Sequence, residues 1–414
     1  MRRRAFMRSG AMAMVSIGLS PAFLRRLAFA TGRRPVGPGK VLIVLFQRGA
    51  ADGLNVVVPH GDPAYYQLRP TIAIPRPSTG VASAVDLDGF FGLHPALSSL
   101  KPLYDRGMLA AIHAVGSPSS TRSHFDAQNF METGIPDDKN THDGWLNRYL
   151  QVAPSKAPFR AVAIAGQTPR AFEGPAPTIA MTNVTDFTVR SSGTDIQRLE
   201  ALYRTGSADL IHGTGTETFE AMKLLKAASP EKYVPANGAS YPAAPFGRAL
   251  QQIAQLVKAN VGLEIAFTDV GGWDTHVNQG SVSGQLAQRL DEFGRGIAAL
   301  TTDLGDRMAD VVIVTMSEFG RMVKENGDAG TDHGHAGVMF AIGGSIRGGK
   351  VLGQWPGLAP EQLYEGRDLA LTTDFRTVLS EVVRTHLGAD RLDAVFPGFP
   401  AGAPDLRLVA GADA

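Results

Sequence analysis

Cysteine is absent from this sequence of 414 residues. Its absence excludes a disulfide framework, a thiolate metal site and a cysteine nucleophile, so any metal ion has to be held by histidine and carboxylate side chains. An excess of charge of one sign is absent too, because 40 Lys and Arg residues nearly balance 39 Asp and Glu residues. A near-neutral chain lacks the basic surface that attracts nucleic acids, and we expect no nucleic-acid partner.

A long uninterrupted apolar run is also missing. The apolar stretch at positions 10–24 contains Pro21 and is short for a membrane span. A hydrophobic content of 44% and a charged content of 19% are typical of a globular protein. The length is sufficient for one large α/β domain or two ordinary domains, and no repeat occurs at a fixed period.

The first 30 residues differ in character from the rest. Positions 1–8 read MRRRAFMR, which resembles the twin-arginine export signal, and Ala28-Phe29-Ala30 offers a cleavage site. These residues hold six of the 40 basic side chains and no acidic one, so the remainder carries a formal charge of −5. We therefore expect a signal peptide at 1–30, recognised by the twin-arginine export machinery. We expect the mature protein to be periplasmic or secreted, with no stable membrane span after cleavage. The alternative is that residues 1–30 remain as an uncleaved anchor.

The remaining chain divides into a linker at 31–40, one α/β domain at 41–400 and a tail at 401–414. Continuous apolar runs at 41–46 and 311–315 are typical of buried central strands, and 109–115 and 263–268 are further strands. The long amphipathic helix predicted at 283–304 joins two of these strands in a βαβ unit. We expect a mostly parallel sheet with helices on both faces and a helical insertion at about 185–260.

Polar residues follow several of these strands. Asp52 comes soon after the first strand, in a turn that suits a ligand; alternatively it only satisfies backbone N–H groups. Hydroxyl groups precede a helix predicted at 125–132. Ser123 there is a candidate nucleophile with His124 beside it, although a serine at this position also suits a helix cap. Arg48 and Arg122 are candidates for steadying an oxyanion, because a guanidinium matches phosphate geometry.

Acidic and histidine residues gather after the later strands. The carboxyl ends of parallel strands meet at one edge of a sheet, so we expect these residues to converge. Carboxylate and imidazole groups are ligands of zinc and manganese, and the number of ions stays open. The candidate metal ligands are Asp52, Asp274, His276, Glu318, Asp332, His333 and His335.

The order of these motifs resembles the alkaline phosphatase and sulfatase superfamily, over most of residues 41–350. The segments FQRGAADGLN, RSHFDAQNFMETG, GGWDTH, SEFGR and DHGHAG more closely resemble the exported bacterial family called domain of unknown function 1501. The resemblance implies an alkaline-phosphatase-like three-layer sandwich. It also implies metal-dependent hydrolysis of a phosphate or sulfate ester, with a small-molecule or glycan ester as substrate.

The chain departs from the superfamily pattern at several positions. His124, not a hydroxyl residue, stands ten positions before Gly134, where the superfamily has its nucleophile. Glu318 replaces an aspartate, and Phe319 replaces a histidine and cannot bind a metal. One metal ion, an altered pair or none are therefore open. The alternative function is a non-catalytic envelope protein that keeps the fold and binds a glycan, a surface component or a partner.

Overall fold

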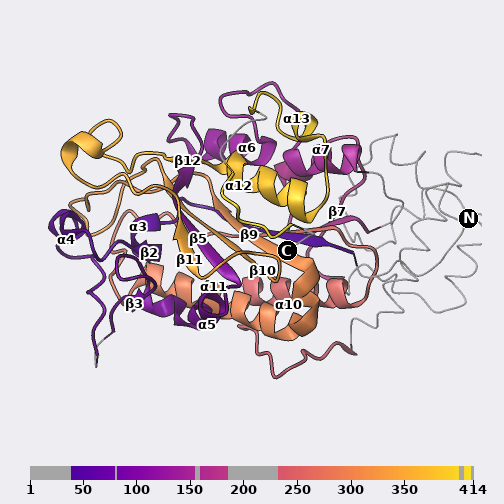
Figure 1. Cartoon of the computed structure of the whole chain (residues 1–414), viewed down its shortest axis with the longest axis horizontal. Helices are drawn as coiled ribbons and strands as arrows, with labels where there is room; N and C mark the ends of the chain where they lie inside the picture. Colours follow the sequence, from indigo (N-terminus) through magenta and orange to yellow (C-terminus); the bar gives the residue numbers. More distant parts are fainter. Residues whose placement is uncertain (1–38, 80–81, 154–158, 185–231, 401–404, 412–414) are drawn as a thin grey trace, which may run out of the picture.

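The structure, a computed structural model, describes residues 39–79, 82–153, 159–184, 232–400 and 405–411. Within these residues a nine-stranded sheet forms the centre of the molecule (Figure 1). Its strands, in spatial order, are β11 (Lys350–Leu352), β5 (Leu109–Gly116), β10 (Gly337–Gly343), β9 (Val311–Ser317), β1 (Val41–Gln47), β8 (Ile265–Val270), β6 (Ala161–Ile164) and β7 (Ile179–Met181), with β12 (Thr373–Asp374) beside β5.

The sheet is mostly parallel, as predicted. Strand β1 pairs in parallel with both β8 and β9, and β6 pairs in parallel with β8 and β7. Strand β10 is the exception, because it is antiparallel to both of its neighbours, β9 and β5. Two reversals restore the direction, so β5 runs the same way as β9. The carboxyl ends of β5, β9, β1 and β8 therefore share one edge of the sheet.

Helices cover both faces of the sheet (Figure 1). One face carries α10 (Pro245–Lys258), α11 (Gln285–Leu304), the 3-10 helix η2 (Pro95–Leu100) and α5 (Lys101–Asp105), which share a core with the sheet. The other face carries α6 (His124–Thr133), α7 (Trp145–Val152), α12 (Phe375–Glu381) and α13 (Leu392–Val395). The apolar runs of β1 and β9 are buried throughout because these layers cover them on both sides.

The smaller elements lie around this sandwich. A second sheet of three short strands comprises β2 (Val57–Val58), β4 (Gly92–Leu93) and β3 (Val85–Asp86). The remaining short helices are α3 (Gly53–Val56), α4 (Pro63–Leu68), η3 (Arg170–Phe172), η6 (Gly305–Asp310), η7 (Pro360–Gln362) and the π-helical turn η8 (Val382–His386).

Two predicted segments differ in part from the structure. The predicted insertion at 185–260 includes α10, which packs directly against α11 and the sheet and thus belongs to the core. Residues 185–231 of that insertion lie outside the described residues, as do the predicted signal peptide at 1–30 and most of the linker. In the predicted tail, Leu408 and Val409 are buried in the core on the α12 side, and the N–H of Val409 donates to Glu381 at 2.9 Å.

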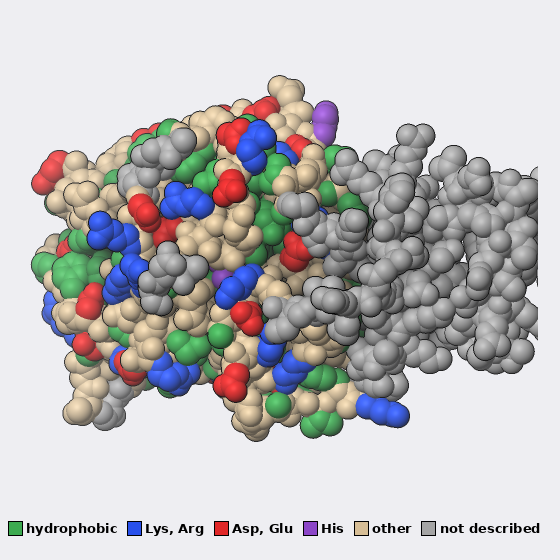
Figure 2. Space-filling model, turned by 45° about the vertical axis from the view of Figure 1, so that its right-hand side comes forward, with side chains coloured by type: hydrophobic (Ala, Val, Ile, Leu, Met, Phe, Trp, Pro, Cys, Tyr) green, Lys and Arg blue, Asp and Glu red, His purple; other side chains and the backbone are tan. Residues whose placement is uncertain are grey.

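The described surface mixes both signs of charge. On the face drawn in Figure 2, basic and acidic side chains are interspersed. Neighbouring charges of opposite sign partly neutralise one another's field. Among the described helices, none combines the length and apolar character that crossing a membrane requires.

Candidate metal centre

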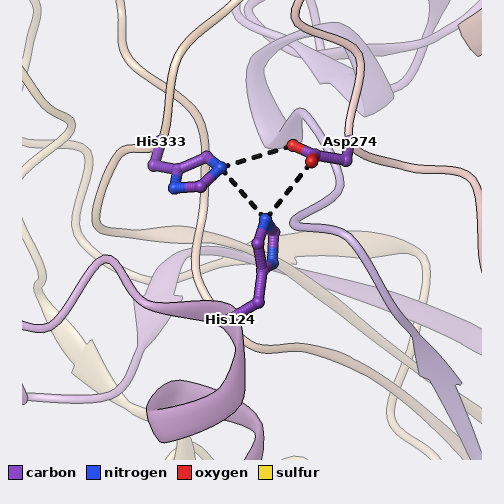
Figure 3. A group of neighbouring side chains, drawn as sticks. All are labelled: His124, Asp274 and His333. Carbon is purple, nitrogen blue, oxygen red and sulfur yellow. Dashed lines mark hydrogen bonds and ion pairs between the residues drawn. The ribbon is translucent and has the colours of Figure 1, made fainter.

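Two loops and the start of a helix, at the shared edge of the sheet, bring His124, Asp274 and His333 together. Along the chain, His124 is the first residue of α6 and follows β5, Asp274 follows β8, and His333 lies between β9 and β10. The two imidazoles and the carboxylate point toward one another (Figure 3), and one ligand atom of each lies within 4.8 Å of the others. The Nε2 atoms of the two histidines are 3.0 Å apart, although the residues are 209 positions apart in sequence.

His276 lies beside this group. Its Nε2 atom is 3.0 Å from Nε2 of His333 and 3.0 Å from a carboxylate oxygen of Asp274. Nε2 of His333 is thus 3.0 Å from Nε2 of both other histidines. We call these three side chains the imidazole row: His124, His333 and His276, with His333 in the middle.

Backbone packing holds the loops of the row against one another. The N–H of Thr331 donates to the carbonyl of Thr275 at 3.1 Å. A Cβ atom on Gly330 would lie 2.1 Å from the carbonyl oxygen of His276, so only glycine permits this approach. The loops that carry His276 and His333 are therefore fixed relative to each other.

Each imidazole of the row has an acceptor on its other ring nitrogen. The acceptors of the Nδ1 hydrogens are Glu318 for His124 at 2.7 Å, Asp332 for His276 at 3.0 Å and the carbonyl of Arg122 for His333 at 2.8 Å. Carboxylates and carbonyls only accept, so Nδ1 carries the hydrogen in all three rings. In the neutral rings the Nε2 lone pairs then face one another.

Facing lone pairs at 3.0 Å repel unless a proton or a cation lies between them. Two nitrogen ligands of a tetrahedral zinc ion, each about 2.0–2.1 Å from the metal, lie about 3.3 Å apart. The Nε2 separation in the row is close to that distance. Imidazoles held by an outer carboxylate are also the usual form of histidine ligands in metal sites. The residues therefore fit a divalent cation.

Glu318 lies beneath His124 and is almost fully buried. Burial alone would raise its pKa, but hydrogen bonds from His124 and Gln128 outweigh burial and hold the pKa of Glu318 below its ordinary value. The N–H of Gly49 also donates to it, at 2.8 Å. The bond to ionised Glu318 in turn raises the pKa of His124, whereas burial lowers the pKa of His333. The two neighbouring rings thus differ in proton affinity.

Arg321 fixes Asp274 from below. Its guanidinium is fully buried, contacts Asp274, and donates to the carbonyls of Ala50, Gly49, Trp273 and Thr331. Burial would raise the pKa of Asp274, but the charge of Arg321 outweighs it and lowers this pKa. Asp274 is therefore ionised and oriented before any cation binds.

Phe319 closes the floor of the site. Its ring centroid is 5.0 Å from those of both His124 and His333, and its side chain is 6% exposed, in a small cluster with Ala50 and Ala127. An apolar ring, which cannot bind a metal, therefore packs beside both histidines.

Two predicted metal ligands lie outside the cluster. Asp52 is fully buried and its carboxylate accepts from Arg69 and from Gln279, while its other oxygen has no partner within the described residues. His335 stacks on Tyr364 with ring centroids 4.2 Å apart, and burial lowers its pKa. Of the remaining predicted ligands, Glu318 and Asp332 hold histidines of the row, while Asp274, His276 and His333 face one another.

Of the predicted catalytic residues, His124 lies in the row and the other three lie outside it. Ser123 is the N-cap of α6, and its hydroxyl accepts a long hydrogen bond of 3.5 Å from the N–H of Asp126. Arg48 pairs with Asp269 and Glu132, and Arg122 pairs with Asp368 and Glu365. Both arginines therefore have carboxylate partners, and the backbone carbonyl of Arg122 is its contact with the row.

Arg321 and Gln128 contact the site but were not among the predicted site residues, although they lie in the segments SEFGR and RSHFDAQNFMETG. Gln128 links the second turn of α6 to Glu318 at 2.9 Å and accepts from Arg48 at 3.0 Å. Its position four residues after His124, on the same face of a helix, was the available signal. For Arg321 the signal was an arginine directly after the turn that ends a buried strand.

A family model described as "Protein of unknown function (DUF1501)" matches residues 39–390. The chain belongs to this family. The match covers all the residues of the imidazole row and their partners. A comparison of this DUF1501 chain with curated proteins gives no match.

Several solved structures resemble this DUF1501 member at low identity. They include the lipoteichoic acid synthase LtaP from Listeria monocytogenes (9% identity, TM-score 0.31, 78% of this chain and 71% of that chain). Others are the PsFucS1 sulfatase from Pseudoalteromonas sp. (14%, 0.32, 80% and 67%) and a magnesium-bound mutant of TAB5 alkaline phosphatase (11%, 0.33, 76% and 94%). TM-scores this low carry no conclusion about activity, which has to come from the site.

Proposed function

We propose that this chain is a metal-dependent hydrolase of phosphate or sulfate esters that works with one divalent cation, zinc or manganese. The observation that carries the proposal is the imidazole row, in which acceptors on Nδ1 direct three Nε2 lone pairs toward one another beside the Asp274 carboxylate. The ester class comes from the resemblance of the motifs to the alkaline phosphatase and sulfatase superfamily.

His124, Asp274 and His333 would hold the cation, with His276 beside them. A divalent cation in such a site supplies Lewis acidity toward an ester oxygen and lowers the pKa of water. Glu318 and Asp332 increase the basicity of the histidines they contact. Arg321 holds Asp274 ionised. These side chains thus assemble the site before substrate arrives.

Three features favour one ion over two. Phe319 covers one side of His124 and His333. Arg321 already supplies a positive charge at Asp274, and one of its nitrogens is 3.4 Å from Nε2 of His276. Arg69 is paired with Asp52, the residue that the resemblance implies as a ligand. Cationic or apolar groups therefore occupy the surroundings that a second ion would need.

We infer direct attack by water in place of a covalent intermediate. Water adds to the phosphorus or sulfur, the bond to the ester oxygen breaks, and the alcohol leaves with one proton of the water. The cap position of the Ser123 hydroxyl favours this route over attack by Ser123. The imidazole of His276, near the row and with 39% of its side chain exposed, would accept this proton from the water and pass it to the departing alcohol.

The test combines metal analysis with turnover. Purified protein should contain one equivalent of zinc or manganese by mass spectrometry and hydrolyse aryl phosphate or aryl sulfate esters. His124→Ala and Asp274→Ala should lose both the metal and turnover, whereas His142→Ala, at an exposed histidine outside the row, should lose neither. Metal-free and inert wild-type protein would refute the proposal, and two equivalents would refute the single ion.

The same measurement decides the second candidate, a non-catalytic envelope protein that binds a partner. Phe319, in the place of a ligand of the superfamily, is the observation that favours it.

Export by the twin-arginine route and a periplasmic or secreted location stay predictions that rest on residues 1–30. Replacing both arginines of the pair by lysine, Arg3→Lys together with Arg4→Lys, should retain the protein in the cytoplasm.

A further inference from the structure

Exposed apolar side chains stand beside the two ends of the imidazole row. Within the described residues, the exposed large hydrophobic side chains are Phe125 (87% exposed), Val277 (51%) and Val234 (78%). Phe125 directly follows His124, and Val277 directly follows His276. Two of these three side chains thus adjoin histidines of the candidate metal centre.

The third residue lies at the opposite edge of the sheet. The segment that carries Val234 is held at the carboxyl end of α11, where the N–H of Ala236 donates to Asp303 at 2.7 Å. Helix α11 begins after the loop of Asp274 and His276 and ends just before β9 starts. It therefore spans the sheet from the metal edge to the far edge, and Val234 serves as a control remote from the row.

The side chain of Phe125 has little contact with the protein, and about half of the Val277 side chain is exposed. Phe125 makes no ring–ring or cation–π contact within the described residues, and the ring contacts of this region belong to Phe319 and the histidines. Single exposed apolar residues are ordinary on protein surfaces. Their placement next to both ends of one candidate centre, open to solvent at Asp274, is what requires a reason.

We propose that Phe125 and Val277 bind the organic group of the ester, so that the substrate of this site is an ester of an apolar alcohol, alkyl or aryl. This inference rests on the proposed function. The polar head of such a substrate would face the imidazole row, and its apolar group would cover the two exposed side chains. Esters of polar alcohols, sugars included, would leave these side chains exposed to water and would gain no affinity from them.

The experiment measures binding by calorimetry on metal-loaded protein with n-alkylphosphonates from methyl to hexyl and the matching n-alkylsulfonates, which have no ester bond and therefore do not turn over. Full burial contributes about 0.8 kcal/mol per methylene, or about fourfold in affinity. For a partly open site we expect affinity to rise about twofold per methylene. The slope should fall in Phe125→Ala and Val277→Ala, vanish in the double variant, and be unchanged in Val234→Ala. Phe125→Leu should keep most of it.

Methylphosphonate and hexylphosphonate that bind equally well would overturn this inference and leave the proposed function standing. Failure of every alkylphosphonate and alkylsulfonate to bind would overturn both. A chain-length slope that the double variant retains would also refute the role of these residues. Finally, the affinity could be independent of chain length while the wild-type protein sediments with anionic phospholipid vesicles and the double variant does not. That result would assign the two side chains to a membrane surface instead. The variants are at exposed positions, and equal melting temperatures would verify that they fold.

Discussion

At the scale of single residues, the row owes its arrangement to the groups behind it. Glu318, Asp332 and the carbonyl of Arg122 each accept a hydrogen from one imidazole, so the same nitrogen of every ring faces the centre. Outer contacts of this kind orient the ligands and increase their basicity. The variants that report most on the site are therefore at residues that do not touch the cation.

Glu318→Gln keeps the shape of the side chain beneath His124 but removes its charge. We expect zinc affinity to fall about 10–100-fold, because the imidazole loses the carboxylate that polarises it. The pKa of His124 in metal-free protein should also fall, since its bond to Glu318 is the largest contribution that raises it. Zinc titration and NMR titration measure the two effects. Glu361→Gln, at an exposed glutamate, is the control, and an unaltered zinc affinity in Glu318→Gln would contradict the positioning role.

Arg321→Met removes the buried cation under Asp274. The carbonyls of Gly49, Ala50, Trp273 and Thr331 then lose their donor, and Asp274 loses its counter-charge. Breaking a fully buried pair on one side typically costs about 3–5 kcal/mol. Because 46% of the Asp274 side chain is exposed and water partly compensates its charge, we expect the free energy of unfolding to fall by less, about 2–3 kcal/mol.

Urea unfolding in the presence of EDTA isolates this effect from metal binding. The matched control is Arg391→Met, because Arg391 pairs with Asp393 on the surface. Such exposed pairs contribute little to stability because water screens their charges. Equal changes in the two variants would show that Arg321 does not hold the site together.

At the scale of elements, α6 carries both a candidate ligand and a candidate nucleophile in consecutive residues. His124 is its first residue, and Ser123 is its N-cap. The cap explains why a hydroxyl stands there: its oxygen accepts a backbone N–H that has no partner within the helix. The same sequence feature had allowed two interpretations, a nucleophile or a cap.

Ser123→Ala and Ser123→Asn separate these roles. Loss of the cap should lower the free energy of unfolding by about 1 kcal/mol in Ser123→Ala, whereas asparagine caps a helix as well as serine and should retain stability. Direct attack by water predicts that both variants keep ester turnover and metal content. Loss of turnover in both, with Ser123→Asn as stable as wild type, would make Ser123 the nucleophile.

Much of the sheet was predictable because continuous apolar runs such as 41–46 and 311–315 have few alternatives in an α/β chain. The direction of the strands was harder to predict than their existence. The apolar run of β10 reads like a parallel strand, and only its pairing with β9 and β5 shows the reversal. The partners of polar residues were least predictable. Asp52 follows the first strand as a ligand would, yet Arg69, 17 positions later, captures its carboxylate inside the core.

At the scale of the whole molecule, two buried histidines tie stability to pH. His113 donates to the carbonyl of Val57 at 3.0 Å, and His386 contacts the carbonyl of Val41 at 3.1 Å. Burial lowers the pKa of each from 6.5 to about 4. The unfolded chain therefore binds protons first as the pH falls. Their contribution to stability is complete above pH 6.5 and is lost as the pH falls toward 4.

Between pH 7 and pH 5 each of these histidines should lower the free energy of unfolding by about 2 kcal/mol. His113→Gln and His386→Gln should each remove about that much of the pH dependence, whatever they do to stability at pH 7. His142→Gln, at an exposed histidine, should leave the dependence as it is. Urea unfolding at the two pH values, on protein freed of metal, measures the difference, and identical pH slopes in all four proteins would refute the assignment.

The span of sequence that the row encloses has a consequence for a protein without cysteine. A cation held by His124 and His333 would join positions 209 residues apart, and thereby close most of the domain into a loop. Tying distant positions restricts the unfolded chain in the way a disulfide does. This metal cross-link, however, would be broken by acid or by a chelator and not by reduction of a disulfide. Its contribution to the stability of the chain would therefore not depend on the redox state of the compartment.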